Sequence, residues 1–175
     1  MSTNLDEQLA FMHLALVEAE KCQASPTAFC VGCVLVLRWP DNGTPTVVST
    51  GYSRELEGNT HAEANALTKL RSLTQDQLAH IFSASSVPFS LDIDEILARL
   101  DVYTTMEPCS IRTSGLAPCA DALIAAKVKR CFIGVGEPAD FVTCEGAQKL
   151  KDAGIEVVWV EGLEEESLRI ARRGH

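Results

Sequence analysis

The chain has 175 residues, 46% of them hydrophobic and 22% charged, which is enough to bury the core of one domain and excludes a disordered chain. No apolar run approaches the ~18 residues that cross a bilayer. The formal net charge of −9 disfavours a nucleic-acid partner, which would need several cationic contacts to phosphates. The first residues contain no basic segment followed by an apolar one, so no secretory signal is expected. We therefore expect one domain over residues 1–175, in the cytoplasm or alternatively the nucleus, with no membrane partner.

Hydrophobic periodicity and turn residues divide the chain into alternating helices and strands. The pattern predicts, in chain order, a helix over 5–22, strands over 30–37 and 46–52, a helix over 61–73, short helices near 78–82 and 92–98, a strand over 101–105, a helix over 120–128, a strand over 130–135, a helix over 144–153, a strand over 155–160 and a helix over 163–172. The first two strands, joined by a turn, form a hairpin. Strands that then alternate with helices predict an α/β/α sandwich with a mixed sheet, its later strands parallel.

Three local features of the sequence lead to separate structural predictions. Asn4, followed by Glu7, matches a capping box for the first helix. Cys30 and Cys33 have the spacing of a metal-binding pair, but on a strand they would point to opposite faces, so we interpret them as core residues. We interpret residues 75–97 as an insertion between a helix and a strand, with no assigned role.

Two stretches place histidine, glutamate and cysteine at predicted helix starts. The sequence THAE at 60–63 opens one helix, and Cys109 and Cys119 each follow a proline, the second at the start of another helix. Proline fits the first turn of a helix, and a thiol there faces the positive helix terminus, which favours the metal-binding thiolate. By itself, THAE also matches a capping box in which Glu63 only reaches the backbone of Thr60.

These residues can meet if the two helix starts lie side by side at one end of the sheet, where ligand sites of such folds occur. His61, Cys109 and Cys119 would then supply three zinc ligands and leave the fourth position open, as in a catalytic site. Glu63 would accept a proton from water that the metal makes more acidic. In an intracellular chain, cysteines brought together in this way indicate a metal more often than a disulfide.

The motifs HAE at 61–63 and EPC at 107–109, with a later cysteine, resemble the signature of the zinc-dependent, cytidine-deaminase-like superfamily. The common form of that signature has two residues between the cysteines, whereas nine intervene here. Longer spacing with a second Pro-Cys is similar to the pyrimidine deaminases of riboflavin biosynthesis, the diaminohydroxyphosphoribosylaminopyrimidine deaminase type. The form R-x-S-G-x-x-P-C at 112–119 resembles their fungal branch, and the likeness extends over 24–32, 51–63 and 134–157.

The resemblance implies the three-layer α/β/α sandwich and five-stranded mixed sheet of the cytidine deaminase fold, in a homodimer with one zinc ion per chain. It implies hydrolytic deamination of 2,5-diamino-6-(ribitylamino)pyrimidin-4(3H)-one 5′-phosphate to 5-amino-6-(ribitylamino)uracil 5′-phosphate and ammonia. Glu63 would be the catalytic residue that carries the proton to the departing nitrogen. The ribityl form follows from the fungal order of the pathway. The reductase domain usually fused to bacterial relatives is not expected here.

Several other residues are predicted to contact the substrate. Candidates for holding its phosphate are Ser110, Arg112, Thr113 and Ser114, which lie between the two cysteines and equally fit a surface loop. Asn59, Ala62 and Asn65 flank the catalytic pair and are candidates for contacting the ring or the ribityl chain, although Asn65 could also be an ordinary polar position of the helix.

Two alternatives remain open. The same zinc chemistry could act on cytidine, deoxycytidylate or a free base, against which the nine-residue spacing and the Arg112 loop argue. The chain could also be a non-catalytic zinc-binding module of the same fold, which would have no use for a proton carrier at Glu63.

Overall fold

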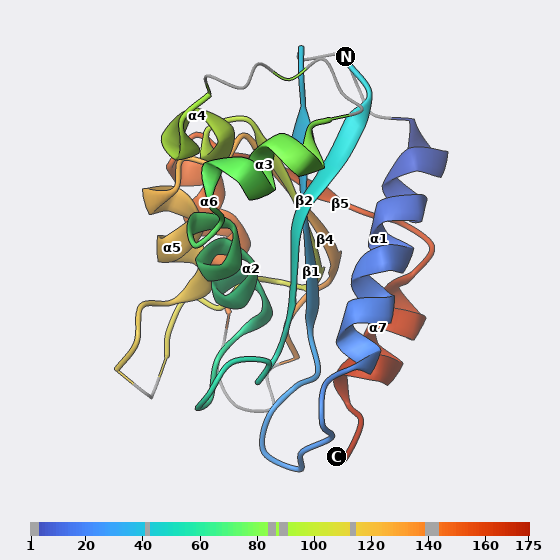
Figure 1. The fold of residues 1–175 in the computed structure, drawn as a ribbon. Helices are drawn as coiled ribbons and strands as arrows, with labels where there is room; N and C mark the ends of the chain where they lie inside the picture. Colours follow the sequence, from blue (N-terminus) through green and yellow to red (C-terminus); the bar gives the residue numbers. More distant parts are fainter. Residues whose placement is uncertain (1–3, 41–42, 84–86, 88–90, 113–114, 139–143) are drawn as a thin grey trace.

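Five strands form one mixed sheet in a computed structural model of the chain (Figure 1), which describes residues 4–40, 43–83, 87, 91–112, 115–138 and 144–175. In sheet order the strands are β2 Pro45–Tyr52, β1 Gly32–Arg38, β3 Leu100–Met106, β4 Arg130–Val135 and β5 Glu156–Trp159. β1 pairs antiparallel with β2 and with β3, whereas β3, β4 and β5 are parallel. The predicted hairpin and the predicted parallel strands are confirmed.

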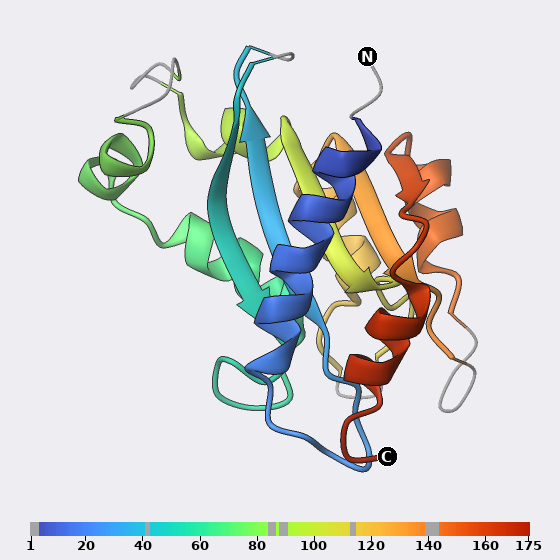
Figure 2. The ribbon, with the colours of Figure 1, turned by 90° about the vertical axis from the view of Figure 1, so that its right-hand side faces the viewer.

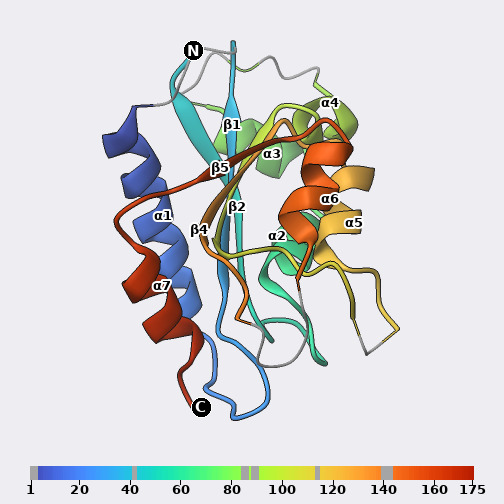
Figure 3. The same ribbon diagram turned by 180° about the vertical axis from the view of Figure 1, so that it is seen from behind.

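Helices cover both faces of the sheet, which confirms the predicted α/β/α sandwich (Figures 1, 2 and 3). One face carries α1 Leu5–Glu20 and α7 Glu164–Ala171. The other carries α2 Ala62–Arg71, α3 Gln75–Ile81, α4 Ile93–Leu97, α5 Cys119–Ala125 and α6 Gly146–Asp152. The predicted helices are all present, and their ends differ from the predicted ends by a few residues.

The strand β1 reads as a continuous apolar run because both of its faces are covered. Every residue of the strand is buried. Leu35 enters the core on the α2 side, whereas Val34 and Val36 enter the core on the α1 side. Cys33 also lies in the α2-side core, and Cys30, just before the strand, is buried as well, so both cysteines are interior residues as predicted.

The segment 75–97, interpreted as an insertion, contributes to the main core. Its two helices, α3 and α4, each begin with a complete capping box. Leu78, Phe82 and Ile96 are buried in the α2-side core. The segment therefore extends the cover of that face and is not a separate unit.

The capping box predicted for α1 is wrong. Asn4 does cap the helix, because its side chain accepts a hydrogen bond from the Asp6 N–H at 3.3 Å. The carboxylate of Glu7 does not reach back to Asn4 and instead pairs with the guanidinium of Arg38 on β1. A guanidinium carries a full positive charge and can donate to both oxygens of the carboxylate, whereas a single backbone N–H offers one donor, which explains the outcome.

A buried ionic group joins the starts of the neighbouring strands β3 and β4 to the end of β1. Asp101 is 0% exposed, and the register places it opposite Val36 on β1 and Arg130 on β4. Its Oδ2 accepts from Arg38 Nε at 2.9 Å and from Arg130 Nη2 at 2.6 Å, and its Oδ1 accepts from Arg130 Nε at 2.6 Å. With Glu7 paired to Arg38, the four charges balance.

We predict that Asp101→Ala lowers the free energy of unfolding by about 3–5 kcal/mol, because it leaves two guanidinium groups without their buried counter-ion. Urea unfolding followed by circular dichroism measures the loss. Asp121→Ala is the matched control: its ion pair with Lys149 is about half exposed, and its removal should change stability by less than about 1 kcal/mol. Equal effects of the two substitutions would contradict the structural role of Asp101.

Candidate metal centre

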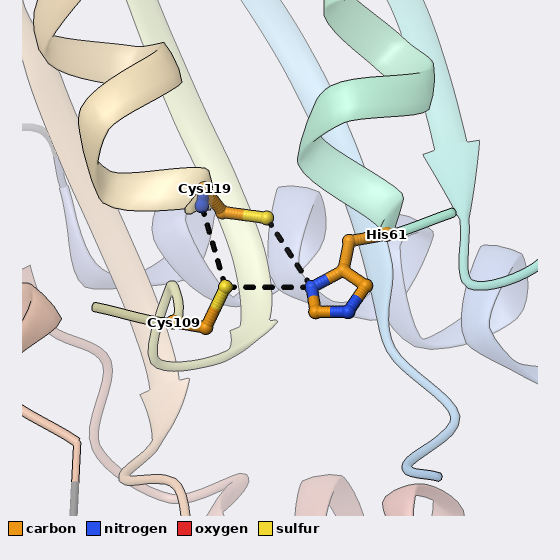
Figure 4. Close-up of side chains that lie close together, drawn as sticks. All are labelled: His61, Cys109 and Cys119. Atoms are coloured by element: carbon orange, nitrogen blue, oxygen red, sulfur yellow. Dashed lines mark hydrogen bonds between the residues drawn. The ribbon is translucent and has the colours of Figure 1, made fainter. Parts of the chain in front are cut away.

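Three metal-ligating side chains converge at the carboxyl end of β3 (Figure 4). Cys109 Sγ lies 3.5 Å from His61 Nδ1, and Cys119 Sγ lies 3.4 Å from the same nitrogen. The three ligand atoms all lie within 4.8 Å of one another. His61 stands at the start of α2, Cys119 is the first residue of α5, and Cys109 lies in the loop that follows β3. The predicted meeting of two helix starts therefore brings the three together.

The loop that carries Cys109 is fixed by α6. Glu107 Oε1 accepts a hydrogen bond from the Ala147 N–H at 2.9 Å, in the first turn of that helix. Ser110 Oγ accepts from the Glu145 N–H at 3.1 Å. A Cβ on Gly146 would lie only 1.7 Å from the carbonyl oxygen of Pro108, so the helix backbone lies directly against the loop. These contacts hold the backbone on both sides of Cys109.

The start of α2 is fixed from the other side by Asn65. Its Nδ2 donates to the Tyr52 carbonyl oxygen at 2.8 Å and lies 3.0 Å from Thr60 Oγ1. The Thr60 hydroxyl itself donates to the Leu56 carbonyl oxygen at 3.0 Å. His61, and not Thr60, is the N-cap residue. The alternative that THAE is only a capping box is therefore wrong, and Glu63 is free for another role.

Glu63 is buried beside the sulfur atoms and is 3% exposed. Its Oε1 accepts a hydrogen bond from the Thr104 hydroxyl on β3 at 3.1 Å. Burial, and then the charge of Cys109, raises the pKa of the Glu63 carboxyl. A buried carboxyl group with a raised pKa is suited to taking up and releasing a proton.

The two thiols have different hydrogen-bonding surroundings. The Cys119 thiol and the Cys119 N–H, at 3.3 Å, both donate to Cys109 Sγ, and with His61 they hold the pKa of Cys109 well below its usual range. Donation to Cys109, together with burial, raises the pKa of Cys119. Two sulfur atoms and one imidazole nitrogen at this spacing fit the donor set of zinc, with a fourth position left for a ligand from outside the chain.

Several of the residues predicted to contact the substrate form hydrogen bonds within the protein. Asn59 is exposed, and its carbonyl oxygen accepts from Arg112 Nη2 at 2.5 Å. Ala62 is buried, Asn65 holds the start of α2, and Ser110 accepts from the backbone before α6. Thr113 and Ser114 lie outside the described residues.

Sequence reasoning missed three acidic or polar residues near the site. Glu107 was visible within the EPC motif, but its contact with Ala147 depends on α6, forty residues further along. Thr104 follows a strand pattern and gave no signal for its contact with Glu63. Glu137, just after β4, is half-buried, and burial raises its pKa although a hydrogen bond with the Cys144 thiol lowers it. Its Oε2 has no hydrogen-bond partner among the described residues.

Comparison with known proteins gives consistent matches. The model of the family described as the cytidine and deoxycytidylate deaminase zinc-binding region matches residues 5–135. The diaminohydroxyphosphoribosylamino-pyrimidine deaminase of Schizosaccharomyces pombe is 41% identical over 94% of this chain, which covers 35% of that protein. The chain thus spans about a third of the length of the curated relatives it matches.

Solved structures agree in fold over almost the whole chain. The crystal structure of the Aspergillus oryzae Rib2 deaminase, a C-terminal deletion mutant, at pH 4.6 has a TM-score of 0.75 and 36% identity, and the match covers 96% of this chain and 92% of that chain. The same deaminase in complex with DARIPP has a TM-score of 0.72 and 34% identity, covering 96% and 91%. These matches confirm the predicted fold class.

We predict that Glu107→Ala weakens zinc binding by about tenfold to a hundredfold, because the loop carrying Cys109 loses its side-chain hydrogen bond to the Ala147 N–H. Competition with a chromophoric zinc chelator measures the affinity of the metal-free chain. Glu145→Ala is the control in the same region, since its side chain is exposed and only its backbone N–H contacts Ser110. Unchanged affinity in a folded Glu107→Ala chain would show that the carboxylate does not position Cys109.

Proposed function

Because the chain belongs to the cytidine and deoxycytidylate deaminase zinc-binding family, we propose that it is a zinc-dependent pyrimidine deaminase of riboflavin biosynthesis. Its substrate would be 2,5-diamino-6-(ribitylamino)pyrimidin-4(3H)-one 5′-phosphate, which loses its C2 amino group as ammonia. The observation that carries the proposal is the convergence of His61, Cys109 and Cys119 beside a buried Glu63. The likeness to fungal deaminases over more than nine-tenths of the chain supports the choice of substrate.

We propose that His61, Cys109 and Cys119 hold one zinc ion per chain. Zinc bound by three protein ligands acts as a Lewis acid and makes a water molecule more acidic. Hydrogen bonds of Asn65 on α2, and of Glu107 and Ser110 to the start of α6, position the backbone beside His61 and Cys109. The hydrogen bond from the Cys119 N–H would help to keep Cys109 as a thiolate.

Glu63 would carry the proton between the attacking water and the departing nitrogen. Thr104 fixes Oε1 through its hydroxyl, which leaves Oε2 to take up the proton and release it. Burial raises the pKa of this carboxyl, which favours uptake of the proton from water. One water adds, one C–N bond breaks, and the products are a ring carbonyl and ammonia.

Residues around the candidate metal centre would bind or position the substrate. Arg112 is a cation in the loop between the two cysteines. Its hydrogen bond to the Asn59 carbonyl oxygen places these two predicted substrate-binding residues side by side. A guanidinium can bind a phosphate through two of its donors. Glu137, whose Oε2 lacks a partner in the described part of the chain, could accept a hydrogen bond from a substrate N–H or O–H. Asn65 and Ser110 would act by positioning the backbone.

We also propose that residues 1–175 form one deaminase domain, that it works as a homodimer, and that it acts in the cytoplasm. In the described part of the chain, no helix is long and apolar enough to cross a membrane. A relative of this chain has been crystallised in complex with DARIPP, which supports a small-molecule partner.

We predict that the zinc-loaded chain releases ammonia from the phosphorylated ribitylaminopyrimidine and that Glu63→Gln lowers kcat roughly a hundredfold to ten-thousandfold. The amide keeps the size of the side chain but cannot carry the proton. Ammonia is measured by a coupled assay and zinc by atomic absorption, so that loss of activity with zinc retained isolates the proton transfer. Glu57→Gln, an exposed change, is the control and should leave kcat unchanged.

The choice of substrate is tested with the ribosyl precursor, cytidine and deoxycytidylate in the same assay. We expect the ribityl compound to be turned over with the highest kcat/KM. Turnover of the cytidine compounds instead would keep the zinc chemistry and replace the pathway. No turnover of any compound by the zinc-loaded chain would favour the non-catalytic module.

We predict that Arg112→Gln raises KM for the phosphorylated substrate by about tenfold or more with little change in kcat, because a phosphate contact is made equally in the ground state and the transition state. Steady-state kinetics measure the two constants, and the dephosphorylated substrate is the control, for which the variant and the wild type should not differ. A fall in kcat alone would contradict a phosphate-binding role.

A further inference from the structure

A second pair of thiols lies outside the candidate metal centre, in the connection between α1 and β1. Cys22 and Cys30 are 1% and 0% exposed, and neither forms a disulfide. Both sulfur atoms lie near the carbonyl oxygen of Gln23, at 3.4 Å for Cys22 and 3.8 Å for Cys30. The two thiols thus share one small polar site inside the protein.

A single guanidinium joins the two sulfur atoms. Arg54 Nη2 lies 2.8 Å from Cys22 Sγ and 3.5 Å from Cys30 Sγ, and it donates to the Gln23 carbonyl oxygen at 2.6 Å. Arg54 Nη1 donates to the Phe29 carbonyl oxygen at 3.2 Å. Arg54 has a φ of 63°, a left-handed conformation that is uncommon for a residue other than glycine. The contacts of its side chain hold the residue in this conformation.

The surroundings favour a thiolate at this site. Arg173 is a second cation beside it, and its Nη2 donates to the Cys22 carbonyl oxygen at 2.8 Å. The Cys22 thiol, followed by the charges of Arg54 and Arg173, holds the pKa of Cys30 below its usual range, while the pKa of Cys22 is raised by its contact with Cys30. A thiolate is the form of cysteine that attacks an oxidant, and a neighbouring thiol can then close a disulfide.

We propose that Cys22 and Cys30 are an oxidisable dithiol, a modification site that a hydroperoxide converts to a disulfide. One sulfur attacks one oxygen of the hydroperoxide and becomes a sulfenic acid. The O–O bond breaks, and the other oxygen leaves as water or an alcohol. The other sulfur then attacks that sulfenic sulfur and displaces its oxygen as a second water. Two thiols lose two electrons and two protons, and with hydrogen peroxide the products are one disulfide and two molecules of water.

The remaining cysteines are poor competitors. Cys33 and Cys131 are as buried as Cys22 and Cys30, but burial raises the pKa of each of these two thiols, whereas the hydrogen bond from Cys22 lowers the pKa of Cys30. Burial also raises the pKa of Cys144. Cys109 and Cys119 lie close enough to react with each other, but a bound zinc ion would occupy both sulfur atoms. In the zinc-loaded chain, Cys22 and Cys30 are therefore the available pair.

The dithiol is connected to the loop before the candidate metal centre. The Arg54 N–H donates to the Thr60 carbonyl oxygen at 2.7 Å, directly before His61. Oxidation removes the charged sulfur that Arg54 contacts, while its bonds to the carbonyl oxygens of Gln23 and Phe29 remain available. Oxidation would therefore alter the contacts of Arg54, which supports the loop before His61. It does not depend on the proposed deaminase activity.

The test treats the zinc-loaded full chain with increasing hydrogen peroxide at neutral pH and maps the cysteines by thiol titration and peptide mass spectrometry. We expect two thiols to disappear first, with a peptide pair joined through Cys22 and Cys30 that has lost two hydrogen atoms and is restored by dithiothreitol. Arg54→Gln should slow this reaction about tenfold, because the thiolate loses its cation. Arg169→Gln, which removes an exposed arginine that pairs with Glu166 in the same helix, should not change the rate.

Cys30→Ser keeps the test decisive if the arginine variant does not fold, since it should abolish the crosslink while the remaining thiols react as in the wild type. The proposal is overturned if Cys22 and Cys30 react no faster than Cys33 and Cys131. It is equally overturned if the first disulfide joins any other pair while zinc remains bound, or if Arg54→Gln and Arg169→Gln oxidise at the same rate in folded protein.

Discussion

Two separate backbone contacts, each too close for a side chain to lie between the segments, position the candidate ligands. A Cβ on Gly51 would lie 2.3 Å from the Ala62 carbonyl oxygen, so α2 begins directly against β2. At the other side, Gly146 leaves no space between α6 and the Pro108 carbonyl. His61 and Cys109 take their positions from these two contacts. Because the constraint is steric, it does not weaken with salt or with pH.

Charge balance gives a second reason to place a cation at this site. Glu63 and Cys109 are acidic groups in one buried region, and the charge of Cys109 contributes to the raised pKa of Glu63. The described donors to Glu63 and Cys109 are a hydroxyl, a backbone N–H and the neighbouring thiol and imidazole groups. Anionic groups buried together are unfavourable unless a cation compensates them. A divalent ion held by two thiolates and an imidazole supplies that compensation.

The sequence predicted the features that short-range patterns determine. The run RCFIGV, predicted as a strand over 130–135, is β4 with the same bounds, and HAE and the two Pro-Cys pairs pointed to the three residues that converge. The capping box at THAE failed because Glu63 is bonded to Thr104, 41 positions away. The contacts of Glu107 and Arg54 were missed for the same reason, since they join segments that only the tertiary fold brings together.

The last residues of the chain complete structure that begins near its start. The Cys30 N–H donates to the Ala171 carbonyl oxygen at 2.9 Å, Arg173 donates to the carbonyl oxygens of Glu20 and Cys22, and His175 stacks on Phe29 with ring centroids 5.0 Å apart. The connection between α1 and β1 therefore has its full set of partners only after residues 171–175 have left the ribosome. During synthesis, the contacts of this connection with residues 171–175 therefore form after α1 and β1 have been translated.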